Sequence, residues 1–482
     1  MGPNCAATLP FRCAAWLKRR AMPIEKRAAS ARSAPQRGRP GPKKPAGPKK
    51  PPPPPPGLAP RRAALDILNL VNGGRSLDEA LEACRSFNAL EGADRGLAHA
   101  LAAIVLRRGG AFDHAIGLYI DKPLPKTASK AHEILRLVAA QSLVLKTPDH
   151  AAVSTAVALA NEFRETAGYA GLVNAVARKI AALDGDFLQK LPERIDTPGW
   201  MWRAWERAYG AETARAIARA HHVEAPLDIT LKDPSDAAAF AAETGGVRLS
   251  TGSVRLAPGT DVATLPGFAA GRFWVQDAAA ALPARLFSSL SGKTVIDLCA
   301  APGGKTMQLA AAGAEVLAVD IAGLRLKIVA ENLARTGLSA KTIKADIRDW
   351  SPEQPADAVL LDAPCSATGT IRRHPDVLRL KSEESVKTLS AMQAGLIDRA
   401  VAMVKPGGEI IYCVCSLQPE EGERQIEAAL SRIAGLSRRP IAEAEIGLSG
   451  AVTRAGDLRT LPSMLADEGG VDGFFAARLI RG

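Results

Sequence analysis

Residues 294–306 read Thr294-Val295-Ile296-Asp297-Leu298-Cys299-Ala300-Ala301-Pro302-Gly303-Gly304-Lys305-Thr306. The run up to residue 298 is short and apolar, which predicts a buried strand, and the glycines after it predict a tight turn into a helix. In open α/β sheets such turns lie at the carboxyl ends of strands, where ligands bind. We therefore predict that residues 299–305 form a ligand-binding loop in a doubly wound, Rossmann-like domain.

The C-terminal part of the chain, residues 271–482, repeats this alternation of strand and helix. Apolar runs predict strands at 294–298, 315–319, 341–344, 357–361 and 408–414. The stretches between them predict helices at 304–312, 322–336 and 383–404. Continuous apolar strands separated by crossover helices imply an α/β fold with a parallel sheet.

An all-α bundle is predicted for residues 58–185. Apolar side chains recur at helical spacing near 63–71, 97–106, 134–144 and 151–160. Ser76 and Glu79 have the spacing of a capping box. The glycine pairs at 73–74 and 109–110 are expected to close helices.

Residues 186–270 predict a small α+β connector domain, with strands at 227–231 and 247–256. Three tryptophans, Trp200, Trp202 and Trp205, lie at its start. Such side chains can stack on nucleic-acid bases. We expect them instead to anchor a packed helix, because aromatic residues at helical spacing usually fill cores.

The net charge of +12 is concentrated in the first part of the chain. Residues 1–62 contain fifteen Lys and Arg residues and one acidic residue, Glu25, so the remainder is nearly neutral. Residues 1–57, with six consecutive prolines at 51–56, predict a disordered basic arm. Two roles remain open for this arm. It could add non-specific affinity for nucleic-acid phosphates, or it could be a solubilising or dispensable extension.

No apolar run is long enough to predict a transmembrane helix. Seven cysteines in irregular positions do not suggest a disulfide scaffold. They indicate a reducing cytoplasm, where thiols serve catalysis or packing.

The loop at 299–305 does not match the two commonest nucleotide-binding motifs. A phosphate-binding P-loop ending in Gly304-Lys305-Thr306 would need glycine where Cys299 stands, and the dinucleotide fingerprint is absent. Asp320 and Asp346 follow the second and third predicted strands. A carboxylate there can bind ribose hydroxyls or an adenine amine. Taken singly, each aspartate is more readily a helix N-cap or turn residue, but their arrangement after successive strands favours a cofactor site. Ribose and adenine without phosphate indicate S-adenosylmethionine.

Two cysteine motifs follow the last two predicted strands. They are Asp362-Ala363-Pro364-Cys365-Ser366 and Cys413-Val414-Cys415-Ser416. A thiolate that adds to carbon 6 of a pyrimidine makes carbon 5 able to accept a methyl group, and a second thiol can assist release. Asp362 is close enough in sequence to Cys365 to bond ring nitrogen 3 of the base.

Other readings of these cysteines are weaker. A metal site at Cys413 and Cys415 lacks further ligands nearby in the sequence, and their spacing is not that of a Cys-x-x-Cys redox pair. A methyltransferase acting on amino groups would be expected to carry an aromatic pocket in place of Pro364-Cys365. For Cys413 we predict a buried, apolar role.

The chain resembles the Sun-type RNA cytosine-5 methyltransferases, and among them the RsmB-like enzymes that act on 16S rRNA. The resemblance rests on the loop and cysteine motifs above and on the following matches: Val275-Gln276-Asp277, Ile371-Arg372-Arg373-His374-Pro375-Asp376, Lys405-Pro406-Gly407-Gly408, Cys415-Ser416-Leu417, Pro419-Glu420 and Asp472-Gly473-Phe474-Phe475. The helical part is similar to a NusB-type RNA-binding domain, on Asp94-Arg95 and Val173-Asn174-Ala175-Val176.

The resemblance implies that Cys415 is the covalent nucleophile and that Cys365 is needed for release. It implies that residues 299–305, with Asp320, Asp346 and Asp362, line the cofactor and reaction site. RNA, in particular 16S rRNA, would be the partner of a cytoplasmic monomer without metal. The chain departs from the family at Cys413 and Val414, at Ala367 in place of glycine, and at Gly422 in place of asparagine.

Two other functions remain open from the sequence. One is a tRNA cytosine-5 methyltransferase, and the other is a non-catalytic NusB-like RNA-binding or assembly factor. The presence of both cysteines and all three strand-end aspartates favours an enzyme, because a factor without catalysis has no chemical need for them.

Overall fold

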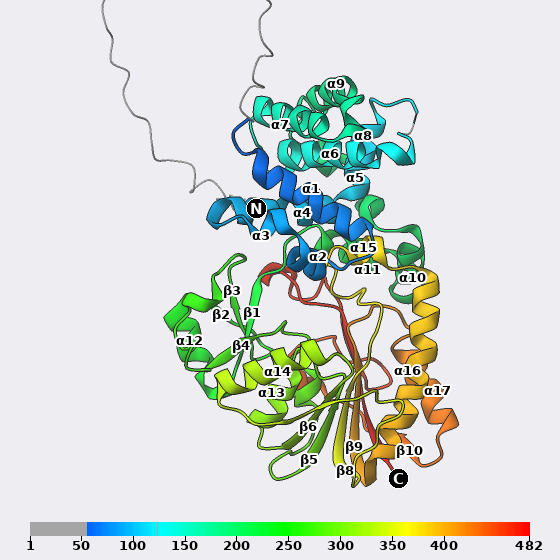
Figure 1. Ribbon diagram of the computed structural model, residues 1–482. Helices are drawn as coiled ribbons and strands as arrows, with labels where there is room; N and C mark the ends of the chain where they lie inside the picture. The colour runs from blue at the N-terminus through cyan, green and yellow to red at the C-terminus, as the bar shows by residue number, and fades with distance from the viewer. Residues whose placement is uncertain (1–54, 123) are drawn as a thin grey trace, which may run out of the picture. The chain divides into compact units, whose positions relative to one another are not determined.

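The computed structural model describes residues 55–122 and 124–482 (Figure 1). The arm predicted for residues 1–57 lies almost wholly outside these residues. None of the described helices combines the length and apolarity required to cross a membrane.

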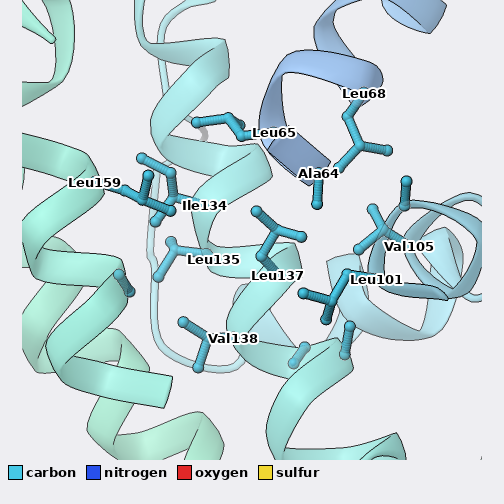
Figure 2. Packing of buried hydrophobic residues seen from close by; sticks show 14 of the residues in the cluster. Ala64, Leu65, Leu68, Leu101, Val105, Ile134, Leu135, Leu137, Val138 and Leu159 are labelled. Atoms are coloured by element: carbon cyan, nitrogen blue, oxygen red, sulfur yellow. The ribbon is translucent and has the colours of Figure 1, made fainter. Parts of the chain in front are cut away.

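A helical bundle begins at residue 58. Its helices are α1 (Leu58–Asn72), α2 (Leu77–Ala83), α3 (Arg85–Asn88), α4 (Gly92–Arg107), α5 (Gly109–Gly117), α6 (Ser129–Ala139), α7 (Asp149–Glu162), α8 (Arg164–Ala167) and α9 (Ala170–Ala181). The four predicted helices are therefore confirmed. Figure 2 shows how Leu65, Leu101, Ile134, Leu137 and Leu159 come from four helices to fill one core. Their burial is what stabilises the bundle, because short helices alone are marginal in water.

The predicted helix ends were partly right. Ser76 and Glu79 form the predicted capping box, and Gly73 caps α1. The prediction that Gly109-Gly110 closes a helix was wrong, because Gly109 is the first residue of α5. Glycine is required there for packing: a Cβ on Gly110 would lie 1.9 Å from the Ile195 carbonyl oxygen.

A small four-stranded antiparallel sheet follows, in the order β2-β3-β1-β4. Its elements are α10 (Gly199–Tyr209), α11 (Ala211–His221), β1 (Leu227–Leu231), α12 (Ala237–Thr244), β2 (Val247–Arg248), β3 (Val254–Leu256) and β4 (Phe273–Val275). The single strand predicted at 247–256 is interrupted by a turn at Gly252, whose φ is 88°. Because β4 pairs with β1, the small sheet extends beyond residue 270, and we propose the boundary of the connector after Val275.

The tryptophans at the start of this region pack as expected. Trp205 is fully buried on α10, and Trp200 and Trp202 pack partly buried against the same cluster. This cluster also includes Ile371 and Leu417, which lie near the two cysteine motifs. The helix therefore supports the site region from one side.

The large sheet has the order β10-β12-β9-β8-β5-β6-β7, with β11 beside β12. Its strands are β5 (Thr294–Leu298), β6 (Glu315–Asp320), β7 (Lys341–Lys344), β8 (Ala356–Asp362), β9 (Val404–Val414), β10 (Leu436–Arg438), β11 (Leu458–Thr460) and β12 (Phe474–Arg481). The five predicted strands, β5 to β9, are confirmed and run parallel. The expectation of a wholly parallel sheet was wrong, because β12 lies antiparallel to β9 and extends the sheet with β10 and β11.

Helices cover both faces of this sheet (Figure 1). They are α13 (Gly304–Ala311), α14 (Gly323–Thr336), α16 (Glu383–Met403) and α17 (Glu423–Arg432). The short helix α15 (Val377–Leu380) packs instead against α1 and α4 of the bundle, and α18 (Glu443–Ile446) follows β10. Successive residues of β5 point to opposite faces: Val295 packs with Leu309 of α13, and Ile296 packs with Leu396 of α16. The fold is thus the doubly wound, Rossmann-like arrangement, and the carboxyl ends of β5, β6, β8 and β9 meet at one edge.

Candidate active site

The two motif cysteines meet at the carboxyl ends of neighbouring strands. Cys365 lies three residues beyond the end of β8, and Cys415 directly follows β9. Because β8 and β9 are parallel and Asp362 is in register with Cys413, the chain brings both loops together. The Sγ atoms of Cys365 and Cys415 are 3.4 Å apart, and both residues are partly buried.

The two thiols are not equivalent. The hydrogen bond to Cys415, together with burial, raises the pKa of Cys365 well above its ordinary value. A thiol with a raised pKa keeps its proton at neutral pH and acts as the donor. Cys365 can therefore donate this hydrogen bond to the Cys415 sulfur.

Asp362 lies between a lysine and a third thiol. Its Oδ2 accepts a hydrogen bond from Lys305 Nζ at 2.8 Å, and its Oδ1 is 3.5 Å from the Cys413 Sγ. Burial lowers the pKa of Lys305, but the Asp362 carboxylate outweighs this and raises it above the ordinary value. Lys305 is therefore a fixed positive charge at the thiol end of the sheet.

Cys413 differs in part from its predicted role. The residue is fully buried, as expected, and burial raises the pKa of its thiol. Its Sγ–H nevertheless faces a carboxylate oxygen instead of an apolar surface. The thiol helps to orient Asp362.

Glu421 connects the loops that carry the two cysteines. Its fully buried carboxylate accepts hydrogen bonds from the Ser366 amide at 2.8 Å and from the hydroxyls of Ser366 and Ser416 at 2.5 Å each. Ser366 follows Cys365 and Ser416 follows Cys415, so one carboxylate positions both thiols. The sequence reading missed Glu421, although its neighbours Pro419 and Glu420 were part of the family match. A glutamate just after a Cys-Ser pair was the available signal.

Ala367 and Gly422, two of the departures from the family pattern, both lie where the backbone or its neighbours restrict the side chain. Ala367 has a φ of 57°, a left-handed conformation in which glycine is the least strained residue. At position 422, a Cβ would lie 2.6 Å from Arg459 Nη2. Arg459 donates to the Ser416 carbonyl oxygen at 2.5 Å, so Gly422 leaves room for an arginine that supports the Cys415 loop.

The loop at 299–305 leaves β5 and enters α13 as predicted. Gly303 has a φ of 103°, and a Cβ there would lie 3.1 Å from Val329 Cγ1, so the turn requires glycine. Cys299 packs against the core on the α16 face, and burial raises the pKa of its thiol. Its side chain is therefore inert, and the loop offers backbone groups of its other residues to a ligand.

Asp297 and Asp320 stabilise this loop through hydrogen bonds. Asp297 accepts a hydrogen bond from Thr306 Oγ1 at 2.6 Å, and burial raises the pKa of its carboxyl group to about 7. Asp320 accepts from the amides of Ala301 at 3.1 Å and Ala322 at 2.8 Å. A carboxylate has about four acceptor positions, so Asp320 keeps capacity for ribose hydroxyls.

Asp346 is partly buried and, unlike Asp320, lies close to the surface. Arg348 forms a bidentate ion pair with it, with Nε–Oδ1 and Nη2–Oδ2 distances of 3.0 and 2.5 Å. These hydrogen bonds lower the pKa of Asp346 to about 2. An adenine amine at this position would share the carboxylate with Arg348.

A cavity of about 470 Å³ adjoins the loop and reaches Asp362. Of the predicted residues, it is lined by Ala300, Ala301, Pro302, Gly304, Lys305 and Asp362. Asp297 also lines it, and its Oδ1 is buried without a hydrogen-bond partner among the described residues. The other predicted cofactor residues, Cys299, Gly303, Asp320 and Asp346, lie outside the lining. The backbone turn, the unpaired carboxylate oxygen and the absence of a phosphate motif fit S-adenosylmethionine.

The fold and these residues define an S-adenosylmethionine-dependent methyltransferase. A family model described as 16S rRNA methyltransferase RsmB/F matches residues 285–480, and the NusB family model matches residues 58–182.

The relatives span nearly the whole described chain. Ribosomal RNA small subunit methyltransferase B of Pseudomonas putida is 35% identical over 444 residues, covering 88% of this chain and 99% of that protein. The protein of the same name from Xanthomonas campestris is 35% identical over 448 residues, covering 88% and 98%. The chain therefore belongs to the RsmB family of 16S rRNA methyltransferases.

Solved structures share the fold at lower identity. The crystal structure of PH0851 covers 88% of this chain and 99% of its own, with a TM-score of 0.71 and 22% identity. NSun6 from Pyrococcus horikoshii, solved with SFG, covers 59% of this chain and 98% of its own, with a TM-score of 0.50 and 18% identity. At these identities the structures support the fold alone.

Proposed function

We propose that this protein transfers a methyl group from S-adenosylmethionine to carbon 5 of a cytosine in 16S rRNA. The observation that carries the proposal is the pair of thiols 3.4 Å apart at the ends of β8 and β9, beside the cofactor loop. Methyl transfer to oxygen or nitrogen needs no sulfur nucleophile, whereas a pyrimidine ring carbon does. The names of the 35% identical relatives supply the RNA class.

In the proposed mechanism, the Cys415 thiolate adds to carbon 6 of the cytosine and a sulfur–carbon bond forms. The electron pair displaced from the ring makes carbon 5 nucleophilic. Bound S-adenosylmethionine supplies the electrophilic methyl group, which carbon 5 accepts as the methyl–sulfonium bond breaks. Loss of the proton on carbon 5 then regenerates the double bond and expels Cys415.

Cys365 and Asp362 have separate proposed roles in this sequence. Cys365 donates a hydrogen bond to the Cys415 sulfur before addition and assists its release afterwards, consistent with its raised pKa. Asp362 accepts a hydrogen bond from nitrogen 3, which takes up the proton lost by the Cys415 thiol on addition and gives it up again when Cys415 is expelled. Lys305, 2.8 Å from Asp362, keeps that carboxylate oriented and adds a positive charge beside the thiols.

The cofactor loop is proposed to act through its backbone. Residues 299–305 would hold the cofactor, with Asp320 at its ribose, Asp346 at its adenine and Asp362 near the reacting sulfonium. We further propose that the protein acts in the cytoplasm as a monomer. The free thiols need reducing surroundings, and one chain supplies every residue of the site.

The test is methyl transfer from labelled S-adenosylmethionine to unmodified 16S rRNA, followed by nucleoside analysis. Labelled 5-methylcytidine at a single position is the expected result. Label in transfer RNA, with none in ribosomal RNA, would overturn the substrate assignment. No label in either RNA would overturn the enzymatic function itself.

A further inference from the structure

A second cavity, of about 460 Å³, lies between the small sheet and α13. Its walls come from β1, β2, β4, the segment 281–290 and the C-terminal turn of α13. It shares only Trp274 with the cavity beside the cofactor loop. None of the candidate catalytic or cofactor residues lines it.

All the charged side chains that line this cavity are positive. Lys232, Arg248 and Arg285 line it, and no aspartate or glutamate does. Within residues 55–122 and 124–482, none of the three cations forms an ion pair, and their only hydrogen bonds go to backbone carbonyls. Three unneutralised cations around one hollow favour an anionic ligand.

The Glu409 carboxylate, which bonds the lining residue Ser288, does not cancel this charge. Glu409 contacts the cavity margin by accepting hydrogen bonds from the amide and hydroxyl of Ser288. Its Oε1 also pairs with Arg439 at 2.8 Å, so its charge is already neutralised. The excess positive charge in the cavity therefore remains.

The other lining residues suit a ring attached to an anion. Leu231, Phe287 and Leu290 give apolar surface, and Ser289 and Gln308 offer hydrogen-bonding groups. The volume is in the range of small-molecule sites, which combine apolar walls with a few convergent polar groups. A phosphate would face the cations, and a base would lie against the apolar wall.

We propose that this cavity is a second binding site, for a phosphorylated nucleoside. Two sources share that chemistry: a free nucleotide, and one residue of an RNA strand that is bound elsewhere for methylation. Binding of the RNA strand depends on the proposed function, whereas binding of a free nucleotide does not.

The experiment measures binding to the full chain by calorimetry, with S-adenosylhomocysteine at saturation to occupy the cofactor loop. The probes are guanosine 5′-monophosphate and a short single-stranded RNA. The variant is Arg248→Gln/Arg285→Gln, whose side chains are exposed and make no ion pair among the described residues. Arg164→Gln, an exposed arginine on α8 of the helical bundle, is the matched control.

The double variant should weaken binding at least tenfold, and the control should leave it unchanged. Loss of nucleotide affinity identifies the free nucleotide as a ligand. Loss of oligonucleotide affinity without any binding of free nucleotide identifies the RNA strand. Equal affinity of wild type and double variant for both probes would overturn the proposal. The nucleotide result is independent of methyl transfer, so it stands even if the proposed function fails.

Discussion

Cys365 and Cys415 differ in what each contributes to the reaction, although their sulfur atoms are only 3.4 Å apart. Cys415→Ala should abolish methyl transfer, because no sulfur remains to add to carbon 6. Cys365→Ala should still allow addition but slow release. A covalent RNA adduct that survives denaturant is therefore expected for Cys365→Ala and not for Cys415→Ala. Gel analysis with labelled RNA measures this difference.

The double variant provides the control for these two substitutions. Cys365→Ala/Cys415→Ala should form no adduct, because the adduct of the single variant depends on Cys415. Normal turnover by Cys415→Ala would contradict the assignment of the nucleophile. If the adduct forms with Cys415→Ala instead, Cys365 is the nucleophile and Cys415 is the thiol needed for release.

Asp297 makes stability depend on pH. Burial raises the pKa of its carboxyl group from an ordinary 3.8 to about 7, so the folded state holds this proton more tightly than the unfolded state. Its contribution is fully present below pH 3.8 and is lost as the pH rises towards 7. A shift of this size is worth roughly 4 kcal/mol.

Asp297→Asn should remove this dependence, because its amide oxygen can still accept the Thr306 hydrogen bond and carries no charge. Urea unfolding at several pH values measures the difference. The free energy of unfolding of wild type, relative to the variant, should fall between about pH 4 and pH 7. Parallel curves for the two proteins would show that Asp297 does not titrate as the structure indicates.

At the scale of elements, the loops after β8 and β9 act together through Glu421. Glu421→Gln removes the negative charge of the carboxylate that accepts hydrogen bonds from Ser366 and Ser416. Both thiols then lose their fixed positions. Methyl transfer should slow by about 10²-fold, as expected for misplacement by about 1 Å. RNA affinity should change little. Single-turnover rates and a binding assay distinguish these effects.

Glu420→Gln is the matched control, because Glu420 is the adjacent residue and, among the described residues, its carboxylate pairs only with Arg424 near the surface. Its rate should remain within about twofold, since such surface ion pairs contribute little. Equal loss of activity in the two variants would contradict the specific role of Glu421.

Local pattern was sufficient to predict the parallel strands and the loop at 299–305. Continuous apolar runs identify buried strands, and glycine marks the turn. The antiparallel strand β12 was not predicted, because its place beside β9 depends on pairing between distant parts of the chain. Glu421 was missed for a related reason, since its partner Ser366 lies 55 residues away. The ion pair between Asp346 and Arg348 was also not predicted from the sequence.

At the scale of the whole molecule, the helical bundle contacts the segment that follows the Cys365 loop. Arg107 of α4 donates to the Arg372 carbonyl oxygen at 2.8 Å, and the Leu77 amide of α2 donates to Asp376 Oδ2 at 3.1 Å. Arg379 Nη1 lies 3.1 Å from Glu133 Oε1 of α6. The two parts should therefore unfold together.

Arg379→Met tests this coupling. The substitution leaves buried Glu133 with Arg136 as its remaining ion-pair partner and Asn72 as a hydrogen-bond donor, and it removes the ion pair between α15 and the bundle. A loss of about 2 kcal/mol should lower the unfolding midpoint by roughly 2 °C and separate the bundle from the methyltransferase domain in calorimetry. The expected result is two transitions where wild type shows one.

Arg178→Met is the control for loss of an arginine, because Arg178 lies on α9 and, within the described part of the chain, its side chain bonds only to Asn174 of the same helix. It should keep the single transition of wild type. A single transition at an unchanged midpoint in Arg379→Met would show that this contact does not couple the domains. Two transitions in both variants would show that cooperativity depends on stability of the bundle alone. Separation in Arg379→Met only would instead place the coupling at α15, beside the loop that carries Cys365.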